Sequence, residues 1–292
     1  MTLETPASKL VARRLADLDV LDLASVATLF LIVLNSGRST VLLAAALIVC
    51  VIGVFSGRAR QSAWFWFAIS GGVALANLRD WYLIDNHKYL LNYWCLAMGV
   101  AHLSNDPKKI LRLNARVIVG LVFLLATLWK LASTEYLSGG FFHYHLLLDT
   151  RFELVARFVG GLSAESIAAN QQLVGNMVRG SGAPLVSLHD AVRLRSIALV
   201  FTWWGLIVEA LLAVAFLVPI KRLTARWRNY LLWLFAMTVY PVVPVIGFGG
   251  QLMLMGLLQS DEEDSFSRRV YVGLLLVTPF YSLLWNGLRQ MI

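Results

Sequence analysis

Residues 113–132 read LNARVIVGLVFLLATLWKLA, a run of twenty residues in which Arg116 and Lys130 are the only charges. Residues 197–218 read IALVFTWWGLIVEALLAVAFLV, in which Glu209 is the only charge. A helix needs about 20 mostly apolar residues to cross the hydrocarbon core of a bilayer. The two stretches therefore predict membrane-spanning helices, and they decide the fold class.

The composition of the whole chain agrees with this prediction. Of the 292 residues, 59% are hydrophobic and 14% are charged, and the mean hydropathy is +0.70. Soluble domains carry about 25% charged residues, so this chain has too little polar surface to cover itself in water. The composition excludes a disordered tail, a disulfide-rich secreted module and a soluble nucleic-acid binder. It predicts an all-α, polytopic membrane helical bundle.

Eight stretches are candidate spans. The seventh is too long for one straight helix, and Pro241 and Pro244 interrupt it. Because proline lacks a backbone donor and clashes with the preceding turn, a broken helix is expected there. One broken span and two half-helices both agree with the sequence. The candidate spans are residues 20–36, 40–56, 62–78, 89–104, 113–132, 197–218, 229–258 and 270–288.

The distribution of Lys and Arg predicts the orientation, because the cytoplasmic loops of membrane proteins are enriched in these residues. With the N-terminus inside, the inner segments hold fourteen basic and five acidic residues, and the outer segments hold ten and eleven. We therefore expect the inner (plasma) membrane, a cytoplasmic segment over residues 1–19, a single membrane domain over residues 20–292 and both termini in the cytoplasm. The net charge of +8 then reflects topology and contact with lipid headgroups, with no nucleic acid as partner.

One connection, residues 133–196, is a long outer segment that is neither a span nor a polar linker. Apolar and charged residues alternate over 152–159, which predicts a short helix lying at the membrane interface. Ser163 is a candidate N-cap for a second helix that runs to about Val178, and Gly180–Pro184 should end it. This segment could form a lid over a cavity, or it could be a structural cap with no ligand beneath it.

Two ionisable residues lie within the predicted spans, where they are costly and usually functional. Lys130, near the outer end of its span, could extend its ammonium to the interface, or it could face a cavity and act as a base. Glu209 lies near the middle of its span. It could form a buried ion pair with Lys130 or an outer arginine, or it could handle protons.

Polar residues also gather in the outer turn before the fourth span. Asp85 or Asn86 could cap the helix, and His87 follows with an imidazole suited to proton transfer near neutral pH. His143 and His145 form a further pair after the fifth span. We expect no metal site there, because two histidines without a third nearby ligand make a poor one.

These polar segments resemble motifs of a known family. Asp85–Leu90, read as Asp-Asn-His-Lys-Tyr-Leu, resembles a motif of vitamin K-dependent gamma-carboxylase and its bacterial relatives, the horizontally transferred transmembrane domain family. Trp129-Lys130-Leu131 followed by Glu135–Gly140 is similar to that family's Lys-Leu segment and the acidic, aromatic, glycine-bearing stretch after it. Val208–Leu212 resembles an acidic position in the next span. The order matches over roughly residues 60–260.

The resemblance implies a site and a chemistry. Lys130 would act as base on a reduced quinone, His87 would assist, and Trp129, Tyr89 and Glu209 would bind the cofactor. The reaction would be that of a carbon–carbon lyase, a carboxylation, and it would need a dry cavity. The chain departs from the family in having no histidine over residues 239–245 and no counterpart of the large lumenal domain of the animal enzyme.

Two functions follow as hypotheses. The first is a membrane enzyme that uses Lys130 and His87, in one outward-facing cavity, on a quinone or another hydrophobic small molecule. The second is a non-enzymatic membrane subunit, either a carrier or an assembly partner of a periplasmic protein or peptide, in which the charged groups form structural ion pairs.

Overall fold

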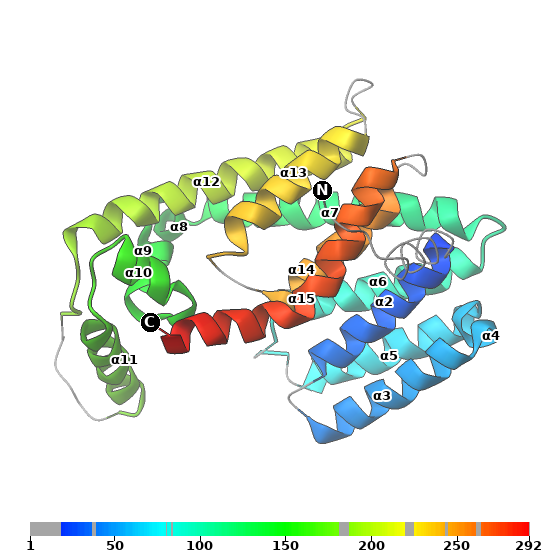
Figure 1. Ribbon diagram of the computed structural model, residues 1–292, viewed down its shortest axis with the longest axis horizontal. Helices are drawn as coiled ribbons and strands as arrows, with labels where there is room; N and C mark the ends of the chain where they lie inside the picture. The colour runs from blue at the N-terminus through cyan, green and yellow to red at the C-terminus, as the bar shows by residue number, and fades with distance from the viewer. Residues whose placement is uncertain are drawn as a thin grey trace, which may run out of the picture. The chain divides into compact units, whose positions relative to one another are not determined.

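The computed structural model describes residues 19–36, 39–79, 81–82, 84–180, 187–219, 225–242, 245–260 and 264–291. This part of the chain contains helices and no strands, which confirms the all-α class (Figure 1). The helices fall into two compact units. Unit 1 comprises Met1–Ile118 and Ile246–Pro279, and unit 2 comprises Val119–Val245 and Phe280–Ile292. The single membrane domain expected from the sequence stays a prediction.

Two long helices, α7 and α15, run from unit 1 into unit 2, and the other helices belong to one unit each. Unit 1 holds α2 (Val20–Asn35), α3 (Thr40–Phe55), α4 (Gly57–Arg60), α5 (Ala63–Arg79), α6 (Asn86–His102) and α14 (Ile246–Gln259). Unit 2 holds α8 (Thr134–Leu137), α9 (Gly140–Leu148), η1 (Thr150–Phe152), α10 (Glu153–Phe158), α11 (Ala164–Val178), α12 (Val192–Leu217) and α13 (Ala225–Val239). The shared helices are α7 (Pro107–Ala132) and α15 (Ser265–Met291).

The local signals in the outer segment are confirmed. Ser163 is the N-cap of α11, where its hydroxyl accepts a hydrogen bond from the amide of Ser166, and the helix ends at Val178. Gly180 follows with a φ of 74°, a left-handed conformation that glycine adopts without strain. The rest of the predicted break, residues 181–186, lies outside the described residues. The short helix expected over 152–159 is α10.

Most candidate spans correspond to a single helix. Among the described residues, two helices, α7 and α12, are long and apolar enough to cross a membrane. Three shorter helices, α2, α3 and α14, are also apolar. The helix positions were therefore predictable from hydrophobic runs, whereas eight crossings stay a prediction.

Helix α12 shows why hydropathy identified it. Its buried face contacts the rest of the protein, and its opposite face carries an exposed apolar stripe with helical spacing. A soluble helix would place polar residues on that exposed face. The stripe consists of Val200, Trp203, Ile207, Leu211 and Val214. An uncovered apolar stripe of this length suits a hydrocarbon surrounding.

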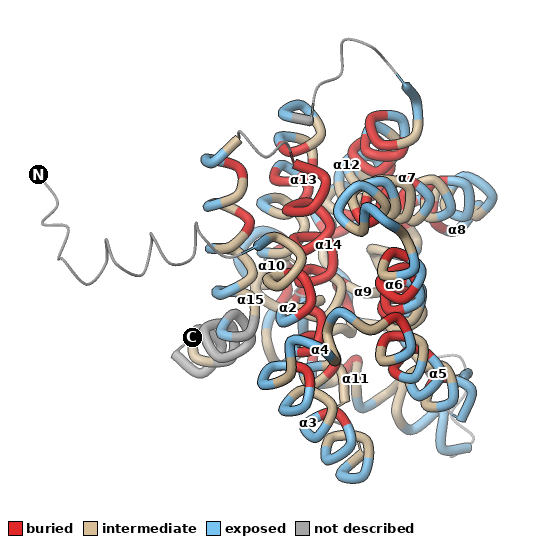
Figure 2. Tube along the Cα trace, turned by 90° about the vertical axis from the view of Figure 1, so that its right-hand side faces the viewer, coloured by how far each residue is buried: buried red, intermediate tan, exposed pale blue. Residues whose placement is uncertain are grey.

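The predicted span over 229–258 is two helices. Helix α13 ends at Val239 and α14 begins at Ile246, with Pro241 in the turn between them and Pro244 outside the described residues. Helix α14 is buried from Gly249 to Gln259 and is red along most of its length in Figure 2. It packs against α2 and α6.

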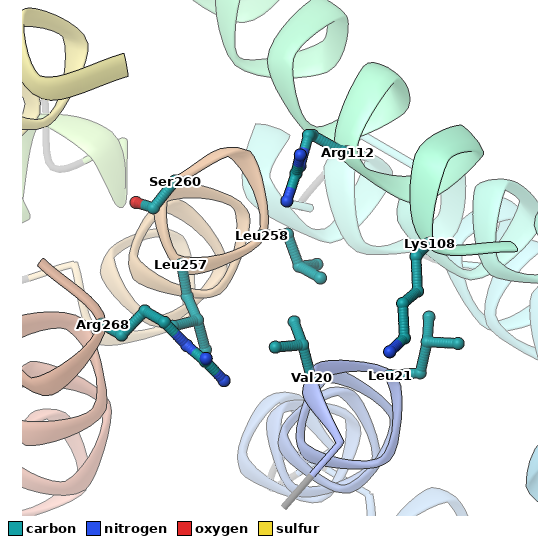
Figure 3. A pocket seen from close by; sticks show the side chains of 8 residues that line it. All are labelled: Val20, Leu21, Lys108, Arg112, Leu257, Leu258, Ser260 and Arg268. Carbon is teal, nitrogen blue, oxygen red and sulfur yellow. The ribbon is translucent and has the colours of Figure 1, made fainter. Parts of the chain in front are cut away.

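Helix α14 runs from one end of unit 1 to the other. Its first turn, at Gly247, lies against Asn35 at the end of α2. Its last turn, at Leu257 and Leu258, lines a pocket with Val20 at the start of α2 (Figure 3). The two helices are therefore antiparallel.

This direction bears on the predicted topology. With 229–258 taken as one span, residues 259–269 and 105–112 would lie on opposite sides of the membrane. The structure instead brings Ser260 and Arg268 to the same pocket as Lys108 and Arg112, so the two connections share one end of unit 1. Two separate helices, α13 and α14, are one of the two alternatives that the sequence left open for residues 229–258, and eight spans with both termini on the same side stay a prediction.

Candidate functional site

Helices α7 and α12 approach closely at a glycine in unit 2. A Cβ added at Gly120 would stand 2.5 Å from Cγ of Leu217 and 3.1 Å from Cβ of Phe216, so only glycine leaves room for α12. Small residues at such contacts are typical of helices packed in membranes. The two helices run antiparallel from this point, and the end of α7 reaches the middle of α12.

This packing brings Lys130 of α7 to Glu209 of α12. The Nζ of Lys130 lies 2.5 Å from Oε1 of Glu209, and the two side chains are 22% and 11% exposed. The ion pair is one of the two alternatives that the sequence left open for Glu209. Because removing two charges from water is costly, such a pair is retained only where its geometry is good or its charge is used.

Tyr136, in the short helix α8, completes the cluster. The Ser133 hydroxyl caps α8 by accepting a hydrogen bond from the Tyr136 amide, at 3.1 Å. The Tyr136 ring then lies under the Lys130 ammonium, 5.1 Å from Nζ to the ring centroid, in a cation–π contact. Burial, with the nearby Glu209 carboxylate, raises the pKa of Tyr136 well above its usual value, so its hydroxyl stays protonated.

Two polar atoms of the cluster, the Tyr136 hydroxyl and Oε2 of Glu209, are buried without a hydrogen-bond partner in the described part of the chain, and so is the Thr202 hydroxyl, two turns from Glu209. Thr202, Gly205 and Glu209 lie on one face of α12. A Cβ at Gly205 would stand 3.3 Å from the Tyr136 hydroxyl. Leaving a buried polar group unsatisfied costs about 1–3 kcal/mol. Atoms of this kind mark the place of a water molecule or a polar ligand.

Aromatic side chains border the Tyr136 ring. Its centroid lies 5.7 Å from those of Phe141 and Phe142, both in α9. Phe142 in turn contacts Phe152 and Phe201, at 6.0 and 5.8 Å. The Lys130 pair therefore lies beside a cluster of aromatic rings, which offers flat apolar surface next to a charge.

The outer segment contains two histidine–aspartate pairs. Nε2 of His143 lies 3.1 Å from Oδ1 of Asp190, and Nδ1 of His145 lies 3.1 Å from Oδ2 of Asp149. Asp149 also accepts hydrogen bonds from the amide and the guanidinium of Arg151. Burial works to raise the pKa of Asp149, but the hydrogen bonds from His145 and Arg151 outweigh it and hold the pKa well below its usual value.

His87 lies in unit 1, at the start of α6. Asp85 occupies the N-cap position, as expected, but its side chain makes no capping hydrogen bond. The His87 ring lies against Gly247, where an added Cβ would stand 2.7 Å from Nε2. Gln251 donates a hydrogen bond to the His87 carbonyl at 3.0 Å, and the Oε1 of Gln251 is buried with no partner among the described residues.

The remaining predicted residues do not join either cluster. Trp129 is 79% exposed on the surface of α7, and the Tyr89 hydroxyl donates to the Trp81 carbonyl at 3.3 Å. Because His87 and Lys130 belong to different units, a cavity shared by the two stays a prediction. Thr202 has no feature in the sequence that singles it out. Tyr136 lies within the Glu135–Gly140 motif, and its role beside Lys130 follows only from the structure.

Comparison of the chain with protein-family models, with curated proteins and with solved structures finds no match. The resemblance to the gamma-carboxylase family therefore stays a prediction, and the site has to be judged by its own geometry.

Proposed function

We propose that the chain is a multi-pass membrane protein. The support is the apolar length of α7 and α12, together with apolar side chains that remain exposed on α3, α7 and α12. Burying this surface in lipid is favourable by about 25 cal/mol per Å², so transfer of the protein from water to a bilayer is favoured. The inner membrane remains the expected location.

We infer an odd number of crossings from the separation of α13 and α14. With α2, α3, α5, α6, α7, α12, α13, α14 and α15 each crossing once, the N-terminus is cytoplasmic and the C-terminus lies outside. Arg268 and Arg269 then move inside and Arg289 moves outside, which leaves fifteen basic residues on the inner side against nine on the outer side. The bias that sets orientation is therefore kept.

Reporter fusions test this topology. Alkaline phosphatase fused after Ile292 should be active and a fluorescent protein at the same place should be dark, whereas fusions after Gln61 should give the reverse. A fluorescent fusion after Ile292 would restore an even number of crossings.

We further propose that the Lys130–Glu209–Tyr136 cluster binds a lipid-soluble compound through a hydroxyl or carbonyl oxygen and moves a proton to or from it. The observation that carries this proposal is the buried ion pair with two unpartnered polar atoms in its cluster, Oε2 of Glu209 and the Tyr136 hydroxyl; the unpartnered Thr202 hydroxyl lies two turns from Glu209 along the same face of α12. Reduced quinone is the ligand class that the sequence resemblance implies, and the adjacent phenylalanine rings suit its flat ring.

The ion pair supplies the base without a change in net charge. When the proton of the ammonium passes to Glu209, Lys130 becomes a neutral amine beside a neutral acid. The amine then accepts the proton of the ligand hydroxyl, and the resulting ammonium stabilises the oxyanion. The Tyr136 hydroxyl is free to donate a further hydrogen bond. A site that excludes water strengthens each of these interactions.

The test removes a single unpartnered hydroxyl. Tyr136→Phe and Thr202→Val keep the shape of each side chain, and Tyr144→Phe, on the exposed Tyr144 of α9, is the matched control. The purified proteins are equilibrated with reduced ubiquinone in nanodiscs, and the retained quinone is measured by mass spectrometry. Retention should fall about tenfold in the first two variants and stay unchanged in the control, since one lost hydrogen bond to a buried polar group is worth about 1.4 kcal/mol. Equal retention in all three would falsify the proposal.

A non-enzymatic subunit is the second candidate, and the ion pair itself favours it, since the Lys130 ammonium already has a close partner. In that case Tyr136→Phe and Thr202→Val should leave quinone retention unchanged. They should also raise the free energy of unfolding slightly, because each removes an unsatisfied group. The same variants therefore separate the two functions.

A further inference from the structure

Three helices of unit 1 meet around a glycine. Gly247 lies in the first turn of α14, and a Cβ added there would stand 2.5 Å from Oδ1 of Asn35 and 2.7 Å from Nε2 of His87. Asn35 ends α2 and His87 lies in the first turn of α6. Both atoms are thus close to one point, so a single nitrogen at about 2.9 Å from each could hydrogen-bond to the two of them.

Two amide side chains of this cluster have a fixed orientation. Asn35 donates from Nδ2 to the Leu31 carbonyl at 2.7 Å, and Gln251 donates from Nε2 to the His87 carbonyl at 3.0 Å. Because a carbonyl only accepts, these bonds identify the nitrogen of each amide and leave the opposite oxygen as an acceptor. Gln251 is fully buried, and its Oε1 has no partner in the described part of the chain.

Gln251 extends toward the same place as the other two side chains. It lies one turn after Gly247 on the same face of α14, and side chains on a helix tilt toward its N-terminus. Asn35 and His87 are only partly buried, so they lie between the buried amide and the surroundings. A buried acceptor without a partner indicates a donor from a polar ligand or a water molecule.

The charge next to the cluster indicates which donor it suits. Asp85, two residues before His87, is exposed, and its side chain makes no capping hydrogen bond. Its carboxylate can therefore balance a cation. A primary ammonium group has three N–H donors, which match the oxygens of Asn35 and Gln251 and a neutral imidazole nitrogen.

The surrounding turn favours a lipid headgroup as the source of the ammonium. Trp81 and Tyr82 precede α6 and are 67% and 70% exposed. The Tyr89 hydroxyl joins this turn to α6 by donating to the Trp81 carbonyl. Exposed tryptophan and tyrosine are typical of the membrane–water interface, where lipid headgroups lie.

We propose that the cluster of Asn35, His87 and Gln251 binds a primary ammonium group, that of phosphatidylethanolamine. The ammonium donates to the two amide oxygens and to a ring nitrogen of His87, and Asp85 balances its charge. Phosphatidylcholine carries three methyl groups in place of the three N–H donors, so it leaves the acceptors unsatisfied. The inference goes beyond the proposed function and depends only on its membrane location.

The first experiment needs no variant. The full chain is placed in phosphatidylcholine nanodiscs, and binding of phosphatidylethanolamine and of its N-methyl and N,N-dimethyl forms is measured by native mass spectrometry. Phosphatidylethanolamine should bind about tenfold more tightly than phosphatidylcholine, and the affinity should fall with each methyl group, since each removes a donor to an otherwise unsatisfied acceptor. Equal affinity across the series would overturn the proposal.

Variants then assign the preference to the cluster. Gln251→Met and Asn35→Leu keep the approximate volume and remove one acceptor each, so each should abolish most of the preference for phosphatidylethanolamine. Gln172→Met, on an exposed glutamine of α11, is the matched control and should keep the preference. An unchanged preference in both test variants would overturn the proposal, and the Gln251 amide would then serve only to hold α14 against α6.

One variant should act in the opposite direction. Asn35→Asp replaces a neutral acceptor with a charged one, so it should bind phosphatidylethanolamine about threefold more tightly. An increase in affinity cannot come from misfolding. Weaker binding than in the wild type would contradict an ammonium beside Asn35.

Free ethanolamine distinguishes a lipid from a soluble amine. Millimolar ethanolamine should not displace phosphatidylethanolamine from the protein, because the lipid is held in the bilayer next to its site. Complete displacement would overturn a lipid as the ligand and assign the cluster to a soluble amine.

Discussion

The two units place their ion pairs differently. In unit 1, Arg60 joins Asp22 at 3.0 Å and also donates to the carbonyls of Gly53 and Val54, at the end of α3. In unit 2, Lys130 and Glu209 meet between two long apolar helices. The pair in unit 1 costs less to bury, because its carboxylate, Asp22, is 38% exposed and water reaches it, whereas Glu209 is 11% exposed. A pair between apolar helices is costly to build, so its presence points to a use.

The largest effect should come from breaking the buried pair. Lys130→Met or Glu209→Leu alone leaves one buried charge and should lower the free energy of unfolding by about 3–5 kcal/mol. The combined variant should recover most of this loss. Denaturant unfolding in detergent micelles measures all three. Additive losses in the free energy of unfolding would mean that Lys130 and Glu209 do not interact. The comparison of this pair with Arg60 and Asp22 in unit 1 would then fail.

Glu209→Lys tests whether the partner of Glu209 is a cation. It places two ammonium groups where the structure has an ion pair, so it should give less folded protein than Glu209→Leu. Equal amounts of the two folded variants would contradict the pairing of Glu209 with a cation.

The second effect concerns Asp149, a carboxylate at a helix end in unit 2. Asp149→Asn loses the charge that His145 and Arg151 contact and should lower the free energy of unfolding by about 1.5–3 kcal/mol at pH 7. The same change at Asp22 should have a smaller effect, because Asp22 is 38% exposed. Equal losses in the two variants would show that burial does not determine how much each ion pair contributes to the free energy of unfolding.

The pH dependence of Asp149 has a definite sign. Its pKa is lower in the folded protein than in the unfolded chain, so its contribution is fully present above the unfolded pKa of about 4 and is lost as the pH falls toward the folded pKa. The difference between the wild type and Asp149→Asn should therefore be constant from pH 7 to about pH 5 and shrink below about pH 4. A difference that grows on acidification would contradict the hydrogen bonds described for Asp149.

The third effect tests how closely unit 1 is packed at His87. Gly247→Ala places a Cβ 2.5 Å from Oδ1 of Asn35 and 2.7 Å from the His87 ring, so it should lower the free energy of unfolding by about 1–3 kcal/mol. Gly273→Ala is the matched control in α15, where a Cβ meets no atom within 4 Å, and it should raise stability by about 0.5–1 kcal/mol. A higher free energy of unfolding for Gly247→Ala would show that α14 is not closely packed against His87.

Local features of the fold could be predicted from the sequence, and spatial ones could not. The Ser163 cap and the break around Pro241 follow from single residues and their neighbours, and both are found where expected. The antiparallel direction of α14 relative to α2 does not follow from hydropathy, because the hydropathy of an apolar segment does not depend on the direction in which the helix runs. The side of the membrane on which Arg268 lies stays a prediction, because it depends on whether α13 and α14 cross the membrane once together or once each.

The site was also predictable only in part. Lys130 and Glu209 are identified as candidates from the sequence because charged residues are rare in apolar segments. Their pairing depends on where α7 meets α12, which is set by the close contact at Gly120. Thr202 is a common residue on a helix, and only the burial of its hydroxyl without a partner makes it a candidate.

The smallest effect belongs to the exposed pair of Asp19 and Lys108, whose side chains are 44% and 50% exposed. Asp19→Asn should change the free energy of unfolding by less than about 1 kcal/mol, since such pairs are screened by water and asparagine can still cap α2. The measured change should shrink further as salt is raised. A loss of several kcal/mol that resists salt would place this pair in the same class as Lys130 and Glu209. Burial would then not explain why the Lys130–Glu209 pair contributes more to stability than the Asp19–Lys108 pair. The two units would differ only in where their ion pairs lie in the sequence.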